Sequence, residues 1–413
     1  MMDRALTATL AFSTALAVAA LSSPQLGRAS ELPVPPGVTV AAAHETPASI
    51  SCTSPGYCTA VGRYSNRATT SALALIESSG KWRSTTEPVL RGSLNSVWCA
   101  SRGNCVAVGA RQTVAGYPQP VVVTERSGTW GRSVLAPVPG DASMTPDNGA
   151  GLASVSCSSM KDCVAVGNYT KGASSVSVGE FQGFLDVETS GTWSSVPISL
   201  PSDAVSQGPI VSRLSSVACS LSACMAVGGY KTSSGFKPMA LTGSGTTWQQ
   251  AVKVSLPIDA LWGALDAVSC STSSECDAAG HLGTSTGGQL WFTGESSGVW
   301  HASVDAVLPV GATPGSGDIA GMSCPAPNQC RAAASYSYAT ASHAQAWRSM
   351  VFTQKNGTWN RGINTAVPAN AAPLPESVAT SVSCVQITYC TILGLYTKPH
   401  HIETSFSVTL PSR

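Results

Sequence analysis

The sequence has little charge for its length. Asp, Glu, Lys and Arg together make up 11% of the 413 residues, and the formal net charge is +1. Proteins that bind nucleic acid carry a concentrated basic field, and this chain has none. We therefore expect no nucleic-acid partner.

Long apolar runs are absent after residue 21. Residues 5–21 form an uncharged stretch that follows Arg4 and precedes small and polar residues. This layout predicts a secretory signal peptide over residues 1–30, cleaved between Ser22 and Glu31, and no membrane span after cleavage. An uncleaved membrane anchor is the alternative, because the run approaches the length of a span. We expect a secreted or cell-envelope protein.

No cysteine stands alone, and C-x-x-C spacing is absent. The fourteen cysteines form seven pairs, five or six residues apart, and each pair flanks a short turn. In an exported protein this pattern favours local disulfides over free thiols or a metal site. The predicted bridges are Cys52–Cys58, Cys99–Cys105, Cys157–Cys163, Cys219–Cys224, Cys270–Cys276, Cys324–Cys330 and Cys384–Cys390.

The cysteine pairs mark a repeat. The first cysteines of successive pairs are 47, 58, 62, 51, 54 and 60 residues apart. In the third repeat, residues 152–157, 163–169 and 184–189 alternate as strands do, and a fourth strand begins at Trp193. A period near 50 residues with four short strands is typical of a β-propeller blade. We predict an all-β, seven-bladed β-propeller with four-stranded blades and one disulfide within each blade, formed by residues 31–413 as a single domain.

A Gly-x-Trp turn recurs between the third and fourth strands. Glycine supplies the positive φ that a tight hairpin requires, and we expect the tryptophan to anchor adjacent blades. These tryptophans are Trp82, Trp130, Trp193, Trp248, Trp300 and Trp359. The seventh repeat lacks this strand. We therefore expect residues 32–43, and within them the segment GVTVAAA, to close the last blade and the ring.

The pattern SVSC-x5-C-x-AVG-x-Y, followed by Gly-x-Trp, resembles the cysteine-containing repeats of exported bacterial propellers, most familiar from actinobacteria. It is more distantly similar to sialidase-like propellers, whose turn has the form Ser-x-Asp-x-Gly-x-x-Trp. Here the tryptophan usually follows the glycine by two positions. The position of the Asp holds Ser78, Arg126, Thr189, Gly243, Ser296 and Lys355. The resemblance implies the fold but does not support sialidase activity.

Residues suited to catalysis are sparse. The carboxylates that we considered are scattered and form no repeated pair of the kind a glycosidase needs. They are Glu45, Glu180, Asp186, Asp266, Asp305 and Glu376. No Gly-x-Ser-x-Gly elbow is present. His400 and His401 offer either a metal site or a fortuitous exposed pair. We expect no metal and no cofactor.

One set of residues recurs where each second strand enters its long loop. The residue six positions after the second cysteine is a tyrosine in five of the seven repeats, and the two exceptions are Arg111 and Leu282. The candidate ligand-binding set is Tyr64, Arg111, Tyr169, Tyr230, Tyr336 and Tyr396. These residues either form an aromatic platform for a ligand or cap the blades through hydroxyl bonds to backbone.

The sequence favours an exported, non-enzymatic binding or scaffolding module, which we expect to be a monomer. The expected ligand is an envelope polysaccharide or a protein, bound where the long, variable loops gather. The alternative is a carbohydrate-active enzyme, a hydrolase or lyase, with its site in the same loops.

Overall fold

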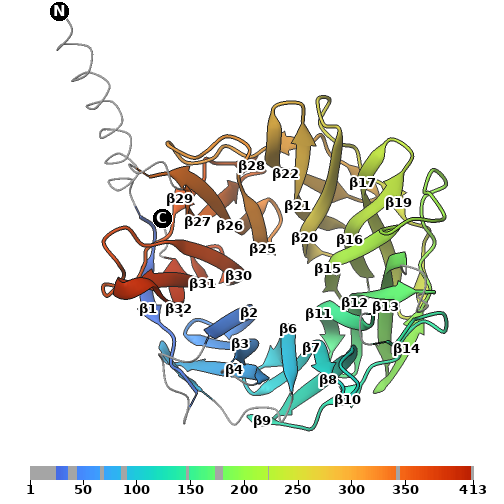
Figure 1. Cartoon of the computed structure of the whole chain (residues 1–413), viewed down its shortest axis with the longest axis horizontal. Coiled ribbons are helices and arrows are strands. Elements are labelled where there is room, and N and C mark those ends of the chain that lie inside the picture. Colours follow the sequence, from blue (N-terminus) through green and yellow to red (C-terminus); the bar gives the residue numbers. More distant parts are fainter. Residues whose placement is uncertain are drawn as a thin grey trace, which may run out of the picture.

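The computed structural model describes residues 25–35, 44–65, 69–84, 91–145, 148–172, 180–221, 223–340 and 345–410. Seven antiparallel sheets surround a central channel (Figure 1). The prediction of an all-β, seven-bladed propeller with four-stranded blades is confirmed. Among these residues no helix is long and apolar enough to cross a membrane.

In blades 1 to 6 the chain runs outward from the channel, strand by strand, whereas in blade 7 the outermost strand comes from the N-terminus. Blades 1 to 3 contain β2 (His44–Ser54), β3 (Tyr57–Ser65), β4 (Thr70–Ser78) and β5 (Lys81–Ser84); β6 (Gly92–Ser101), β7 (Asn104–Gln112), β8 (Pro118–Arg126), β9 (Thr129–Trp130) and β10 (Val134–Leu135); and β11 (Ala150–Ser159), β12 (Asp162–Lys171), β13 (Glu180–Thr189) and β14 (Thr192–Val196). Blades 4 and 5 contain β15 (Ser212–Ser220), β16 (Ala223–Thr232), β17 (Gly235–Ser244), β18 (Thr247–Trp248) and β19 (Val252–Lys253); and β20 (Trp262–Thr272), β21 (Glu275–Thr284), β22 (Gly287–Ser296), β23 (Val299–Trp300) and β24 (Val304–Asp305). Blades 6 and 7 contain β25 (Asp318–Ala326), β26 (Gln329–Ala339), β27 (Gln345–Lys355), β28 (Thr358–Trp359) and β29 (Ile363–Asn364); and β30 (Ser377–Gln386), β31 (Tyr389–Lys398), β32 (Ile402–Leu410) and β1 (Arg28–Glu31).

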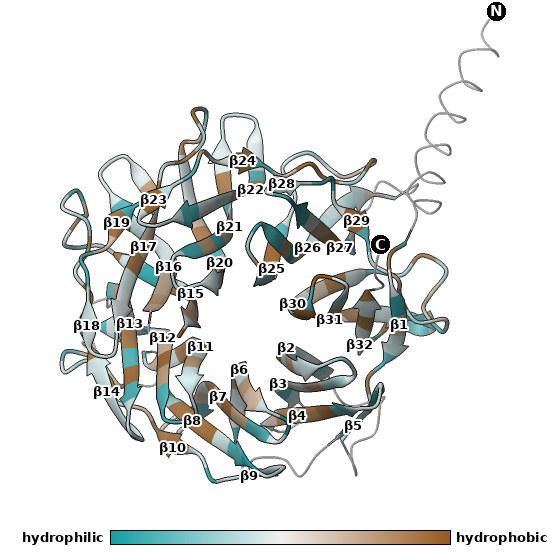
Figure 2. Cartoon of the chain, turned by 180° about the vertical axis from the view of Figure 1, so that it is seen from behind, coloured by the Kyte–Doolittle hydropathy of each residue, from teal (hydrophilic) through white to brown (hydrophobic). Residues whose placement is uncertain are grey.

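All seven predicted disulfides are present, one in each blade. Each joins the two innermost strands, and in blade 3 the bridged residues are direct cross-strand partners, Cys157 and Cys163. A bridge at this point fixes the register of the first hairpin, so the same side chains face the neighbouring blade in every repeat. Both hydrophobic and hydrophilic residues occur along the strands (Figure 2), and in β3, β7 and β12 five consecutive residues are buried, because each sheet packs between two neighbouring blades.

The Gly-x-Trp turns have the predicted geometry. In five blades a Ser-Gly or Asn-Gly pair has positive φ at both positions, as in Ser190 (54°) and Gly191 (87°), which is the requirement of a type I′ hairpin turn. The tryptophan that follows packs against the core between two blades. Trp130 is 7% exposed, and the others are partly buried.

The ring is closed by the N-terminal strand, as predicted, but by different residues. The closing strand is β1, Arg28–Glu31, which pairs with β32 (Figure 1). Leu26 and Leu32, on either side of it, are 4% and 1% exposed. The segment GVTVAAA lies outside the described residues. The sequence of β1, RASE, is short and polar and overlaps the end of the predicted leader, so no apolar alternation marks it as a strand.

Serines link each inner strand to the next. An inner strand has no partner on its channel side, so its backbone N–H groups need acceptors. Serines that stand one or three residues before the first cysteine of each blade accept them at 2.9–3.3 Å, at all seven interfaces. Each pair below gives the accepting serine first and the residue that donates its backbone N–H second: Ser49 and Val97, Ser51 and Cys99, Ser96 and Val155, Ser154 and Val217, Ser156 and Cys219, Ser216 and Val268, Ser269 and Cys324, Ser323 and Cys384, Ser381 and Ile50, and Ser383 and Cys52.

Candidate binding site at the channel mouth

The channel is narrow and lined by small residues of all seven inner strands. Its cavity measures about 220 Å³. Serines, alanines and a glycine supply most of the wall, and Asp266 is the one carboxylate among the lining residues. The channel therefore presents hydroxyl groups, with its charge concentrated at a single point.

A β-bulge places Asp266 in the channel. Every inner strand has a register shift four residues before its first cysteine, and in β20 the shift falls between Leu265 and Ala267. The extra residue at a bulge is left unpaired and can redirect its side chain. The residues at this position are Ala48, Asn95, Ala153, Ser215, Asp266, Ala320 and Thr380.

Asp266 lies between two basic side chains. Its Oδ1 accepts a hydrogen bond from Arg213 Nη2 of blade 4 at 2.7 Å. Its Oδ2 lies 2.5 Å from His281 Nδ1 of blade 5. Charge-assisted bonds of this kind hold planar groups in fixed orientations. The carboxylate is 17% exposed, the Arg213 side chain 37% and the His281 side chain 31%, so the basic groups face the solvent more than the acid does.

Trp262 stands beside this trio. Its ring centroid is 5.5 Å from that of His281, and the planes meet at 67°. Trp262 is 42% exposed although it begins an inner strand. Its cross-strand partner is Gly283, where a Cβ atom would come within 2.1 Å of the indole nitrogen. The absence of a side chain at Gly283 thus makes room for the indole.

Blade 5 departs from the repeat at these positions. Where Trp262 stands, the other repeats have His44, Arg91, Gly149, Val211, Ser316 and Glu376. Where Gly283 stands, they have Ser65, Gln112, Thr170, Lys231, Ser337 and Thr397. His281 and Asp266 are likewise the only His and the only Asp at their repeat positions. Residues that conform to a repeat are explained by packing, whereas a group of exceptions in contact needs another explanation.

The structure places the six predicted ligand-binding residues in separate blades. Tyr169, Tyr230, Tyr336 and Tyr396 are buried, at most 5% exposed. Their hydroxyls donate to side chains, not to backbone as the capping interpretation had it: to Asp141, Asp203, Asn364 and Asn370. Tyr64 is partly buried, and Arg111 donates to Gln119. A ligand-binding role for the six stays a prediction.

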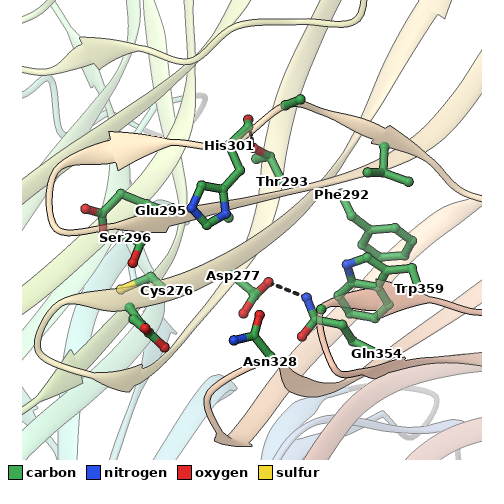
Figure 3. A pocket seen from close by; sticks show the side chains of 15 residues that line it. Cys276, Asp277, Phe292, Thr293, Glu295, Ser296, His301, Asn328, Gln354 and Trp359 are labelled. Atoms are coloured by element: carbon green, nitrogen blue, oxygen red, sulfur yellow. Dashed lines mark hydrogen bonds between the residues drawn. The ribbon is translucent and has the colours of Figure 1, made fainter.

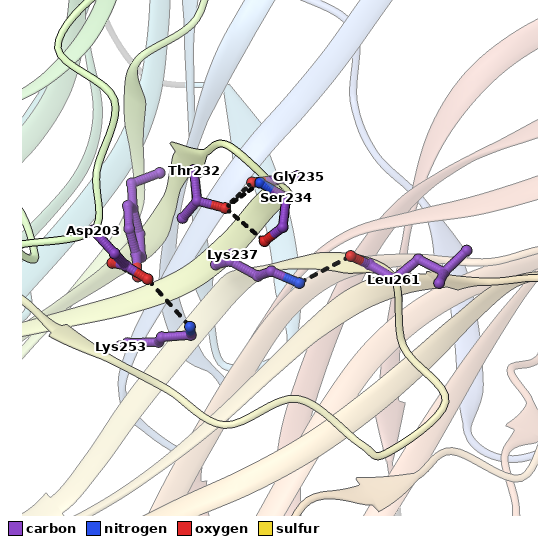
Figure 4. A network of polar contacts seen from close by, with 8 residues as sticks. Asp203, Thr232, Ser234, Gly235, Lys237, Lys253 and Leu261 are labelled. Atoms are coloured by element: carbon purple, nitrogen blue, oxygen red, sulfur yellow. Dashed lines mark hydrogen bonds and ion pairs between the residues drawn. The ribbon is translucent and has the colours of Figure 1, made fainter.

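The acceptors of three of these tyrosines come from loop turns that recur in the repeats and that we had overlooked. A Pro-x-Asp-Ala or Pro-x-Asn-Ala sequence closes a turn in which the Ala N–H donates to the Pro carbonyl, as in Ala204 and Pro201 at 3.0 Å. Asp203 of this turn accepts from Tyr230 at 2.7 Å and pairs with Lys253 (Figure 4). The hydrogen bond from Tyr230, with the Lys253 ammonium, lowers the pKa of Asp203. In blade 5 Leu282 replaces the tyrosine.

The opposite face also has pockets between blades. One, of about 150 Å³ between blades 5 and 6, contains Asp277, which accepts from Gln354 at 2.8 Å (Figure 3). Burial raises the pKa of Asp277. Asp277 also lies near Cys324 and Cys330, a grouping that resembles a metal site. These two cysteines are bridged, so they offer no thiolate for a metal.

Contrary to our expectation, some carboxylates do recur. Glu77, Glu125, Glu188 and Glu295 occupy the same position before the Gly-x-Trp turns, and Gln354 takes this position in blade 6. Burial raises the pKa of Glu77 and Glu125. Both belong to the wall of a pocket of about 400 Å³ between blades 1 and 2.

These two carboxylates diverge. Glu125 is the cross-strand partner of Cys105, whose sulfur lies 3.6 Å from Thr59 of blade 1, so Glu125 faces blade 1. Glu77 shares its face of β4 with Leu73 and Leu75, which pack in one cluster with Leu393 of blade 7, so it faces the other way. The pocket therefore does not hold a convergent carboxylate pair.

His400 and His401 lie exposed in the 3-10 helix η1 (Pro399–His401). No third His, Cys or acidic side chain joins them within the described ranges. Neither histidine belongs to the candidate site at the channel mouth, which is made of Trp262, Arg213, Asp266 and His281.

Comparisons with known proteins concern the fold. No protein-family model and no curated protein matches the chain. An α-L-arabinofuranosidase of Fusarium graminearum is 12% identical over 94% of this chain and 98% of that chain, with a TM-score of 0.48. A Hadza microbial sialidase is 12% identical over 86% and 73%, with a TM-score of 0.43. A Dyadobacter fermentans protein of unknown function is 11% identical over 94% and 99%, with a TM-score of 0.48. Both enzymes and a protein without a known activity are thus among the propellers similar to this chain.

Proposed function

We propose that the protein is an exported binding module that holds its ligand at the channel mouth and does not transform it. The observation that carries this proposal is the state of the channel carboxylate. Asp266 is the only acid among the channel-lining residues, and both of its oxygens are engaged, by Arg213 and His281. Glycoside hydrolysis requires two carboxyl groups about 5–9.5 Å apart.

Export is supported by seven disulfides, which persist in oxidising compartments. The N-terminal sequence adds the layout of a leader. If β1 closes the ring of the exported protein, signal cleavage falls before Leu26, whose side chain is buried in the last blade. N-terminal sequencing of the exported chain tests this. A first residue after Leu26 would contradict it.

A second candidate, hydrolysis, is favoured by one observation. His281 bonds Asp266 through Nδ1, which leaves Nε2 free in the manner of an oriented general base. Among the described residues no channel serine is hydrogen-bonded to His281, and no cysteine is free, so the imidazole has no nucleophile in position to activate.

The test measures binding and turnover on the same sample. Purified protein is incubated with envelope polysaccharides and with peptides, and retention is measured by affinity electrophoresis while released reducing ends or new amines are counted. We expect retention without product. Product formation that disappears in His281→Ala would replace the binding function with the hydrolytic one.

A further inference from the structure

The geometry points to a neutral sugar ring as the ligand, stacked on the indole of Trp262 and hydrogen-bonded by Arg213 and His281. This inference rests on the proposed binding function and specifies its ligand class. It is carried by the way Trp262 is held, by the charge of the groups beside it and by the chemistry of the channel wall.

Trp262 is held as a flat, open surface. One part of the indole lies against the backbone of Gly283, and His281 meets it edge to face. Because 42% of the residue stays exposed, the remaining surface faces solvent. A large aromatic ring fixed before binding loses little conformational entropy when a ligand stacks on it.

The segment that leads to Trp262 is fixed by blade 4. Lys237 Nζ donates to the Leu261 carbonyl at 2.9 Å (Figure 4). The adjacent hairpin is itself closed by Thr232, whose hydroxyl donates to the Gly235 carbonyl at 2.9 Å. Gly235 in turn lies against Leu261 and Trp262: a Cβ atom added at Gly235 would be 3.3 Å from the Leu261 carbonyl oxygen and 3.7 Å from the Trp262 Cβ. Supporting contacts of this kind keep a binding residue in one orientation.

The trio of Arg213, Asp266 and His281 carries no net charge when the imidazole is neutral, because the Arg213 guanidinium is balanced by Asp266. An anionic sugar would find its cation already occupied. Arg213 and His281 still have further N–H groups or a ring nitrogen with which to bind hydroxyls. The serines of the channel below offer more hydroxyl partners. Several directional polar groups around one aromatic surface suit a sugar.

An apolar protein segment is the competing ligand, because Ile258 and Leu261 of the same loop are 99% and 58% exposed. A protein docked on this patch would contact all three apolar residues. A sugar stacked on the indole beside the trio would not depend on Ile258, which is the second residue of the turn closed between Pro257 and Ala260. Ile258 therefore gives a matched control.

The experiment measures, by affinity electrophoresis, how strongly the full exported chain is retarded in gels that contain a glycan. The glycans are a neutral β-glucan, α-glucan, mannan or arabinan, or the anionic polygalacturonate. We expect at least one neutral glycan to retard the protein. Trp262→Ala should weaken this binding about tenfold or more, and Trp262→Phe should recover part of it because a flat ring remains. Gly283→Ala should also weaken it, by displacing the indole, while circular dichroism and thermal midpoint show that the fold persists. Ile258→Ala should leave it unchanged.

Each other outcome contradicts a defined part of the inference or of the proposed function. Retention by polygalacturonate alone, or by no glycan, overturns the neutral-sugar inference while leaving a binding module for another ligand. Equal losses in Ile258→Ala and Trp262→Ala overturn it in favour of an apolar docking patch. Undiminished binding in Trp262→Ala places the sugar elsewhere. Cleavage of the retained glycan leaves the ligand class intact and overturns the proposed non-enzymatic function.

Discussion

The Oγ of Ser383 accepts a hydrogen bond from the backbone N–H of Cys52 at 3.0 Å, joining the last blade to the first. Serines one or three residues before the first cysteine make such bonds at every other interface, so the segment that carries the cysteines also connects the blades. The disulfides constrain each blade internally, whereas the serines satisfy the free edge of the next inner strand. The short segment that ends at each first cysteine, with serine at one or both of two positions, thereby serves both levels of the architecture.

Replacement of Ser383 by Ala should lower the free energy of unfolding by about 1–2 kcal/mol, because the Cys52 N–H loses its acceptor in a partly buried interface. Chemical denaturation of the oxidised protein measures this. Ser202→Ala, in an exposed loop turn, is the matched control and should change the free energy by less than about 0.5 kcal/mol. Equal effects at the two positions would contradict a structural role for the serine bond.

Removal of the closing strand should destabilise the ring. A chain that begins at Leu32 lacks β1 and the buried Leu26, and it exposes the edge of β32. We expect a loss of about 3 kcal/mol or more relative to a chain that begins at Gln25, with concentration-dependent aggregation measured by light scattering. Arg28→Ala, which keeps the strand and changes an exposed side chain, should behave like the longer chain. Equal stability of both chains would show that β1 is dispensable.

The repeat made the fold predictable because each blade supplies the same evidence. Seven cysteine pairs and six Gly-x-Trp turns fix strand order and register without any long-range information. The closing strand was not predictable in this way, since RASE occurs once and its pairing with β32 joins segments almost the whole chain apart. Its position depends on tertiary contacts of Leu26 and Glu31, which no local pattern reveals.

The candidate site was hidden for the opposite reason. Recurrence along the sequence points to the tyrosines, whereas Trp262, Asp266, His281 and Gly283 are exceptions to the repeat. An aligned comparison of the repeats would have shown these four departures. It would not have shown that a bulge turns Asp266 toward the channel, because the bulge is a backbone feature shared by every blade.

Acid should loosen the closing strand. Burial alone would raise the pKa of Glu31, but its bonds from Lys398 and Asn370, with Tyr396, outweigh burial and lower it. A lowered folded-state pKa stabilises the protein above the usual value near 4.5, and this contribution is lost as pH falls through the folded-state value. The Glu31→Gln variant should lack this acid-sensitive contribution to the free energy of unfolding, which we expect to be about 0.5–1 kcal/mol.

Hydrogen exchange of β32 at pH 6 and pH 3 measures this effect. The unmodified protein should lose protection at the lower pH by more than the Gln variant does. Glu403→Gln, at an exposed position of the same blade, is the control and should retain the full pH response. If Glu31→Gln also retains it, Glu31 does not couple closure to pH.

Asp186 should make the protein less stable as pH rises. It is fully buried in blade 3, at a position where other blades have Leu75, Val123 or Leu241. Burial raises the pKa of Asp186 to about 8, and Ser195 opposes this only weakly, since neither carboxylate oxygen makes a well-formed hydrogen bond. The folded state keeps a proton that the unfolded chain releases near pH 4, so stability falls between about pH 4 and pH 8. The loss over this range should be roughly 3–6 kcal/mol.

Asp186→Asn should flatten this dependence, because the amide does not titrate, and Asp186→Leu should both flatten it and raise stability by restoring the apolar contacts of the other blades. Urea denaturation at pH 4, 6 and 8 measures the slopes. Asp305→Asn, which removes an exposed carboxylate, provides the control and should preserve the original slope. Parallel curves of unfolding free energy against pH for Asp186→Asn and the unmodified protein would mean that Asp186 ionises in the folded state with its ordinary pKa. In that case a hydrogen-bond donor must stabilise the ionised carboxylate of Asp186 between blades 2 and 3, where Phe184 of the same strand face is packed.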